Sequence, residues 1–114
     1  MKTRNEVLEI SFDLAVKIIE FSEELENQKK FVIARQLLRS GTSIGANIRE
    51  AQSAESKADF IHKLKIAHKE AIETEYWLAL VKVSKSYPSP STEILELLTS
   101  VQKLLNTIIS TSKK

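Results

Sequence analysis

The chain has 114 residues and a mass of 12.9 kDa, a length that fits one domain spanning residues 1–114. It has no Cys, which excludes disulfides, thiolate catalysis and Cys-ligated zinc, and its two Gly residues argue against a Gly-rich phosphate loop. Seventeen basic and fifteen acidic side chains give a net charge of +2. This balance permits a polyanionic partner but does not require one.

The beginning of the chain does not have the composition of a secretory signal. Charged residues interrupt it at Arg4, Glu6, Glu9 and Asp13. No apolar run approaches the roughly 18 residues that a membrane helix needs. We therefore expect a cytoplasmic protein without a membrane partner.

Apolar residues recur at spacings of three and four along most of the chain, which predicts helices at residues of about 5–26, 31–53, 57–85 and 91–110. Short polar connections between them favour an all-α, antiparallel up-down-up-down four-helix bundle. The third helix would span about 43 Å, more than a compact monomer of this size requires. Its length therefore suggests an oligomer.

Two helix starts carry capping signals. Ser56 can accept a backbone N–H, and Asp59 stands in the first turn, where the helix dipole favours negative charge. For the last helix, Ser89 followed by Pro90 suits an N-cap, and Ser91 is a rival cap.

Gly41 and Gly45 interrupt the second predicted helix four residues apart. Each interior Gly costs a helix about 1 kcal/mol relative to Ala, so a compensating role is expected. A close helix–helix crossing is the favoured interpretation. A bend near residues 41–45 and a ligand-facing role are the alternatives.

The two histidines do not suggest a metal site. His62 and His68 are six residues apart on the third predicted helix, which places them on opposite faces. Asp59 and His62 form one Asp-x-x-His pair, whereas metal sites in bundles use such a motif twice. We expect no metal and no cofactor.

An acidic cluster on the third helix has two interpretations. The cluster could perform acid–base catalysis through the carboxylates of Glu70, Glu73 and Glu75. The hydroxyl groups of the second helix have no His on the same helix to act as a base, so they do not suggest nucleophilic catalysis. In an antiparallel hairpin, Arg39 should lie beside residues 70–74. A partly buried ion pair of Arg39 with Glu73 or Glu70 is therefore favoured, and no catalytic residue is assigned.

Asn47 stands among apolar neighbours on the second helix. A buried Asn must find hydrogen-bond partners, and such residues often fix helix register. Ser43 lies one turn away and could share the same polar contacts.

Several exposed positions are candidates for binding. A set of basic side chains could contact phosphate groups, although such a set is often only a solvated face: Arg35, Arg49, Lys57, His62, Lys65 and Lys69. Tyr76 and Trp77 lie in the middle of the third helix, with Trp77 off the core seam. Their placement suggests a subunit interface.

The run LRSGTSIGANIREA at residues 38–51 resembles the second-helix signature of the four-helix-bundle family encoded in intervening sequences of bacterial 23S rRNA genes. That signature reads about LRRAxxSIPxNIAEG. Ser56 and Lys57, followed by an acidic residue and Phe60, resemble the start of the family's third helix. The chain departs from the pattern at Gly45, where Pro is common, and at Ala51, where Gly is common.

The resemblance implies a bundle that assembles into a ring, typically a homopentamer, without enzyme activity. It also implies a relation to the accessory variability protein of diversity-generating retroelements, a basic pentamer that works with a reverse transcriptase and RNA. Six positions match polar positions of the family, and we interpret them as a structural network: Arg39, Ser43, Asn47, Glu50, Glu73 and Glu75.

Two functions are therefore expected. The first is a non-enzymatic homo-oligomer that binds RNA, DNA or a nucleic-acid-processing partner through a mildly basic face. The alternative is a protein–protein interaction scaffold with no nucleic-acid role.

Overall fold

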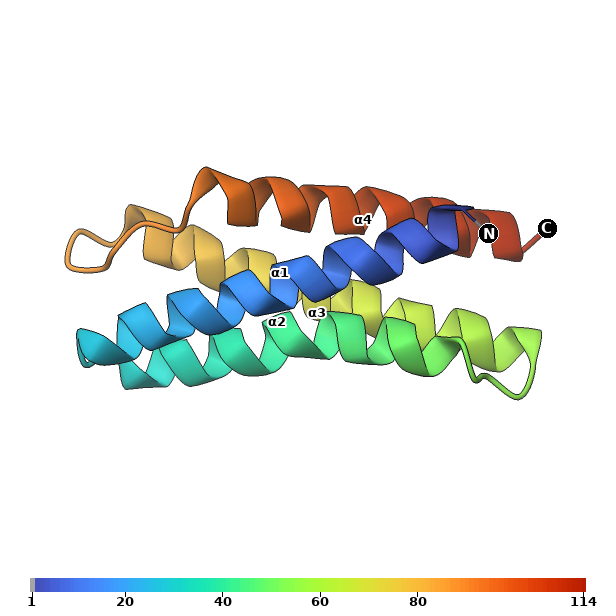
Figure 1. Ribbon diagram of the computed structural model, residues 1–114, viewed down its shortest axis with the longest axis horizontal. Coiled ribbons are helices and arrows are strands. Elements are labelled where there is room, and N and C mark those ends of the chain that lie inside the picture. Colours follow the sequence, from blue (N-terminus) through green and yellow to red (C-terminus); the bar gives the residue numbers. More distant parts are fainter. Residues whose placement is uncertain (1) are drawn as a thin grey trace.

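Residues 2–114 are described by a computed structural model, with side chains from residue 4 onward, and fold into four helices. These are α1 (Lys2–Asn27), α2 (Phe31–Ala51), α3 (Lys57–Val83) and α4 (Thr92–Ser112). Consecutive helices run in opposite directions, so that α1 begins and α4 ends at the same end of the molecule (Figure 1). Helices α1 and α3 each pack against both α2 and α4 and lie diagonally across the core from each other. The predicted all-α four-helix bundle is confirmed.

The core consists of aliphatic side chains that recur every three or four residues on all of these helices. Full burial of one such side chain contributes about 1.5–3 kcal/mol. The largest fully buried side chains are Leu14, Ile18, Leu25, Leu37, Ile44, Ile48, Leu64, Leu78, Leu105, Val7, Val81 and Val101. Polar residues interrupt the apolar runs on the outer faces. Within residues 2–114, no helix is long and apolar enough to cross a membrane.

The predicted starts of α2 and α3 coincide with the observed ones at Phe31 and Lys57, whereas the other helix ends differ by one to three residues. Helix α1 begins at Lys2, α2 ends at Ala51, α3 ends at Val83 and α4 ends at Ser112. Polar residues near helix ends carry no apolar periodicity, so the pattern alone cannot place these ends.

The structure decides between the capping residues. The backbone N–H of Asp59 donates to Ser56 Oγ at 3.0 Å, which confirms Ser56 as the cap of α3. Ser91 accepts a backbone N–H from the first turn of α4 at 3.2 Å. The interpretation of Ser89 as the cap is wrong, because Pro90 lies buried in the loop before the helix.

The turn between α1 and α2 is a Schellman motif built without glycine. The N–H of Lys30 donates to the carbonyl oxygen of Leu25, and the N–H of Lys29 to that of Glu26, both at 2.8 Å. Lys29 takes the left-handed conformation, with φ of 64°. The sequence predicted a polar turn here but not a Schellman motif, because the left-handed position of that motif is usually Gly and not Lys.

The two glycines lie in an unbroken α2, so the alternative of a break near residues 41–45 is wrong, and the favoured close crossing is present. A Cβ at Gly41 would lie 2.7 Å from Cγ2 of Ile18 on α1. At Gly45 the nearest atom would be Ser11 Oγ at 3.4 Å. The close crossing of α1 and α2 therefore depends on Gly41 in particular.

The bundle is elongated, with extents of 46 × 22 × 19 Å and a radius of gyration of 14.4 Å. The 27 residues of α3 span about 40 Å and fit along the long axis. The length of α3 therefore gives no reason for oligomerisation, because a single copy accommodates it. Any argument for assembly must come from the surface.

Candidate nucleic-acid and protein interfaces

A row of basic side chains lies on the outer face of α3. His62, Lys65 and Lys69 are exposed and lie one turn apart, opposite the buried face of the helix. We call these three residues the basic stripe. None of them forms an ion pair with any side chain that the structure describes.

The basic stripe lies in the positive half of α3. Residues 57–69 contain four Lys and one Asp, whereas residues 70–75 contain three Glu and no basic residue. This division gives residues 57–69 an excess of three positive charges (4 − 1), of which Lys63 is paired with Glu50 of α2. The net charge of +2 for the whole chain does not show this uneven distribution of charge along α3.

The other basic candidates lie away from the stripe. Lys57 Nζ donates to the carbonyl oxygen of Lys114 at 3.1 Å, at the end of the bundle where α4 ends. Arg35 and Arg49 are exposed on α2. The six candidates therefore do not form one continuous surface.

Arg39 joins α2 to α3 through two carboxylates. Its Nη1 lies 3.1 Å from Glu70 Oε1, and its Nη2 is hydrogen-bonded to Glu73 Oε2. The indole N–H of Trp77 also donates to Glu73, at 3.0 Å. The predicted ion pair of Arg39 is thus present with both of the alternative partners at once, and about half of the Arg39 side chain is exposed.

This arrangement shifts the ionisation of both partners. The hydrogen bond from Arg39, followed by that from Trp77, holds the pKa of Glu73 below its ordinary value. The hydrogen bond to Glu73 in turn raises the pKa of Arg39. These groups stay charged at neutral pH, as an ion pair between two helices requires.

Glu73→Gln is expected to destabilise the protein at pH 7 by at most about 1 kcal/mol, since the pair is partly solvated. The folded pKa of Glu73 is lowered, so its stabilisation is present above the unfolded value of about 4.3 and is lost as pH falls through the folded pKa. Thermal unfolding at several pH values should show the two proteins converging in acid. Glu96→Gln, at an exposed position of α4, is the control. A difference that does not change with pH would contradict the assignment.

The remaining family-matched positions make separate contacts. Ser43 Oγ donates to the carbonyl oxygen of Arg39 at 2.6 Å, and Asn47 Nδ2 donates to that of Ser43 at 2.8 Å. Glu50 pairs with Lys63 of α3 at 3.1 Å. Asn47 is half-buried and bonds to its own helix.

The family-matched set is therefore not one network. Glu75 is exposed, and it has no ion pair within the part of the chain described. Glu75 does not pair with Arg39 because its side chain points in a different direction from that of Glu73. Glu75 is only two residues from Glu73, and on a helix this spacing turns it away from Arg39.

One buried polar contact was not predicted. The Oγ atoms of Ser40 and Thr74 are hydrogen-bonded at 2.9 Å, and both side chains are fully buried between α2 and α3. Thr74 Oγ1 also donates to the carbonyl oxygen of Glu70 at 2.8 Å. The antiparallel register of the two helices could have predicted this contact, because Ser40 comes to lie near Thr74 once Arg39 lies beside Glu73.

The two aromatic candidates of α3 differ in exposure. Trp77 is half-buried and packs against the core, whereas 58% of Tyr76 is exposed. Their rings meet edge to face with centroids 5.4 Å apart. Tyr76 belongs to an exposed apolar row that we call the α3 stripe: Ile72, Tyr76, Leu80 and Val83.

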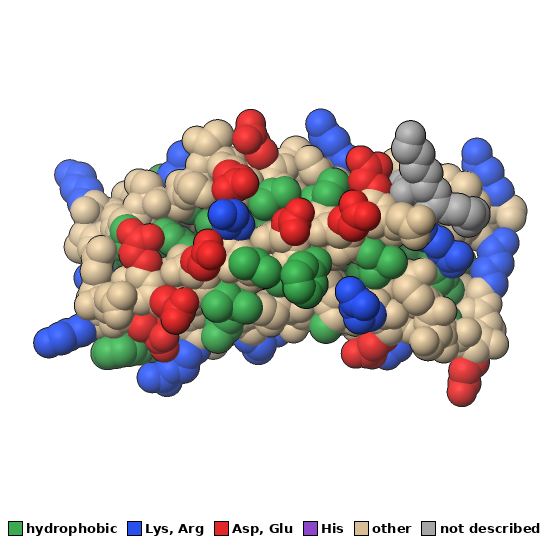
Figure 2. Space-filling model, in the orientation of Figure 1, with side chains coloured by type: hydrophobic (Ala, Val, Ile, Leu, Met, Phe, Trp, Pro, Cys, Tyr) green, Lys and Arg blue, Asp and Glu red, His purple; other side chains and the backbone are tan. Residues whose placement is uncertain are grey.

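A second apolar surface lies over α1 and α2. Hydrophobic side chains gather along the middle of this face, with acidic side chains beside them (Figure 2). Its large exposed members are Phe12, Val16, Ile19 and Leu38. Between the helices it is hollowed into a shallow groove, lined by Leu8, Ser11, Phe12, Ala15, Thr42, Gly45, Ala46 and Arg49. We call this surface the α1/α2 groove.

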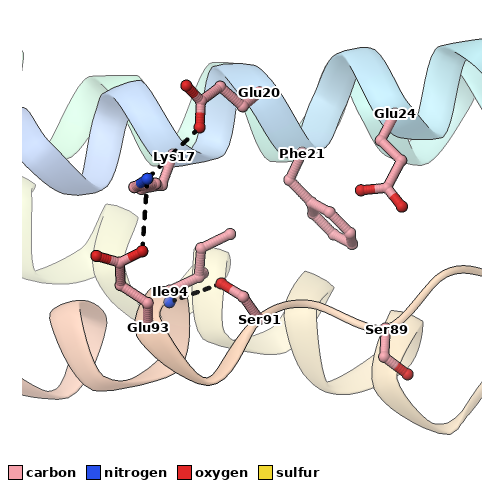
Figure 3. A pocket seen from close by; sticks show the side chains of 8 residues that line it. All are labelled: Lys17, Glu20, Phe21, Glu24, Ser89, Ser91, Glu93 and Ile94. Atoms are coloured by element: carbon pink, nitrogen blue, oxygen red, sulfur yellow. Dashed lines mark hydrogen bonds and ion pairs between the residues drawn. The ribbon is translucent and has the colours of Figure 1, made fainter.

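A further hollow of about 310 Å³ lies between α1 and the start of α4. Lys17 points across it and pairs with Glu20 at 3.8 Å and with Glu93 at 3.4 Å (Figure 3). Such exposed pairs contribute little to stability. Among residues 4–114, no group of three His, Asp or Glu side chains is placed to hold a metal ion.

Comparison with known proteins identifies the family. The family model of the 23S rRNA-intervening sequence protein matches residues 3–107. The chain belongs to this family. The resemblance carried by residues 38–51 is thereby confirmed, and the match extends over nearly the whole bundle.

A solved relative of this 23S rRNA-intervening sequence protein agrees in fold. It is the crystal structure of a protein of unknown function from the S23 ribosomal protein family of Bacteroides thetaiotaomicron VPI-5482. The two chains are 48% identical over 95% of this chain and 98% of the other, with a TM-score of 0.86. A search of curated proteins finds no match. The comparisons indicate no catalytic family.

Proposed function

We propose that this 23S rRNA-intervening sequence protein is a non-enzymatic, self-associating bundle that works in the cytoplasm and binds nucleic acid through the basic stripe. The observation that carries the proposal is the exposed row of His62, Lys65 and Lys69. These side chains make no ion pair within the described chain, whereas Arg39 and Lys63 nearby are paired.

The chemistry of the stripe suits a phosphate backbone more than individual bases. Lysines act as point charges toward phosphates, and this term does not depend on sequence. Exposed aromatic side chains that could stack on bases are absent from the stripe itself. We therefore expect the shape and charge density of the nucleic acid to determine binding.

The test compares two charge-reversal variants with the same total charge. Lys65→Glu/Lys69→Glu changes the stripe, and Lys82→Glu/Lys85→Glu changes two exposed residues, one in the last turn of α3 and one in the loop that follows it. Fluorescence anisotropy with a labelled RNA hairpin, and with a DNA duplex of the same sequence, is measured between about 50 and 200 mM salt. The stripe variant should lose at least about tenfold in affinity and reduce the salt slope by about two, because each phosphate contact contributes about 0.9.

Two outcomes would contradict the proposal. One is no binding of the unaltered protein to either nucleic acid at low salt. The other is an equal loss in the two variants, which would show that only overall charge matters.

The alternative of a protein–protein scaffold is favoured by the exposed apolar surfaces. Self-association does not depend on nucleic acid, and five copies is the number that the family resemblance implies. Light scattering of the unaltered protein at micromolar concentration should give a multiple of 12.9 kDa. Assembly without any nucleic-acid binding would support the scaffold.

A further inference from the structure

We infer that the α3 stripe of one copy docks in the α1/α2 groove of a second copy, with Glu75 of the first facing Arg49 of the second. This inference rests on the proposed self-association and names the two surfaces that form it. It leaves the basic stripe open, because that row precedes the α3 stripe along the helix.

The first argument is exposure of large apolar side chains. Phe12 in the groove is 59% exposed, Tyr76 in the stripe is 58% exposed and Val83 is 77% exposed. Soluble monomers rarely expose contiguous apolar surfaces of this kind, and aromatic residues are enriched where proteins meet. We therefore expect each of the two surfaces to be covered by an apolar surface of a partner.

The second argument is that the two surfaces match in length and relief. Leu8 to Ile19 along the groove and Ile72 to Val83 along the stripe each include twelve residues, with ends about 16 Å apart along the helix axis. Four of the residues that line the groove are small: Ser11, Ala15, Gly45 and Ala46. Their short side chains leave a hollow between the helices, which a side chain of the stripe such as Tyr76 can enter.

The third argument is that one copy cannot join these surfaces by itself. Helix α1 and helix α3 lie diagonally across the core, and their backbones do not pack against each other. Their one cation–π contact among the described residues places Arg4 of α1 over the Phe60 ring of α3, far from the α3 stripe. The stripe faces outward on α3, so it cannot reach the groove of its own chain. A second copy carries the same groove in a form that is accessible to it.

The fourth argument is charge complementarity. Arg49 lines the groove, is exposed and has no ion pair among the residues described. Glu75 borders the stripe, one residue before Tyr76, and is likewise exposed and unpaired. Opposite charges at the edges of two apolar surfaces favour one orientation of docking over others.

The two surfaces are different, so the contact between copies is heterologous. Each copy keeps one free stripe or one free groove after pairing, and further copies add until a ring closes or a filament grows. A twofold dimer would instead use the same surface on both copies. This difference makes the inference testable by mixing.

The mixing experiment uses two variants at exposed positions, Phe12→Glu in the groove and Tyr76→Glu in the stripe. Each variant alone should have the mass of one chain, 12.9 kDa, by light scattering in nuclease-treated buffer. Their equimolar mixture should form a complex of twice that mass and nothing larger, because only one intact stripe and one intact groove remain. Circular dichroism of each variant confirms that the helices are retained.

Charge exchange provides a second test. Arg49→Glu and Glu75→Arg should each reduce the assembled mass, and the double variant should restore it. Arg35→Glu, an exposed position of α2, is the matched control and should assemble normally. The inference is overturned if the unaltered protein is a monomer, if either mixing variant assembles alone, or if the double exchange fails to restore assembly. Lys65→Glu/Lys69→Glu should still assemble, so failure of nucleic-acid binding remains distinguishable.

Discussion

Gly41→Ala is expected to lower the free energy of unfolding by about 1–2 kcal/mol, although Ala is the better helix former by about 1 kcal/mol. The new Cβ would lie 2.7 Å from Cγ2 of Ile18. Ile18 is fully buried and branched at Cβ, so it has little freedom to change rotamer. Relief of the clash therefore requires α1 and α2 to separate, which disturbs the core contacts on both sides.

Gly45→Ala is the matched control, one turn further along the same helix. Its Cβ would meet Ser11 Oγ at 3.4 Å, an ordinary contact at a half-buried position. This variant should gain up to about 1 kcal/mol from helix propensity. Urea unfolding followed by circular dichroism measures both. Equal stabilisation by the two variants would show that the crossing at Gly41 is not tight.

Thr74→Val is expected to destabilise the bundle by about 1–3 kcal/mol. The side chains are nearly equal in shape, so the change removes a hydroxyl without opening a cavity. Ser40 would then lose its partner on α3 while remaining fully buried. An unsatisfied buried hydroxyl costs its desolvation energy, and this cost dominates the expected effect.

The double variant Ser40→Ala/Thr74→Val separates this explanation from packing. Removing both hydroxyls leaves no unsatisfied side-chain group, so the double variant should be more stable than Thr74→Val alone. Denaturant midpoints of the four proteins give the coupling free energy. Strict additivity of the two single changes would contradict a direct interaction between the hydroxyls.

The outer surface of α3 is divided between two proposed tasks. Residues 57–69 carry the positive charge, whereas the apolar residues that follow face a neighbouring copy in our proposal. In a closed assembly, the basic stripe would be repeated once for each copy. Repetition would raise affinity for a long polyanion without any new contact, because later contacts become intramolecular.

Residues of the chain alone predicted much of the bundle. Seam positions such as Leu64 and Leu78 are buried as expected, and Ser56 caps α3. The pairing of Arg39 with Glu70 and Glu73 followed from antiparallel register. These features are local or follow from one hairpin, so spacing along the sequence is sufficient to find them.

Other features depended on distances between helices. The choice of Ser91 over Ser89, the left-handed Lys29 and the contact of Ser40 with Thr74 have no distinct sequence pattern. The α1/α2 groove was also missed. Its members lie on two helices, and each helix alone presents only a few scattered apolar side chains.

By itself, the sequence determined the number of helices, their order and the faces that they bury, because periodicity in an α-helix specifies direction around its axis. Only the tertiary structure decided how closely α1 and α2 approach, and therefore that Gly41 serves packing and not a bend. It also decided which polar residues pair and which apolar residues stay exposed. Burial and pairing depend on what a neighbouring helix places opposite each side chain, and that information is not contained in the spacing of one segment.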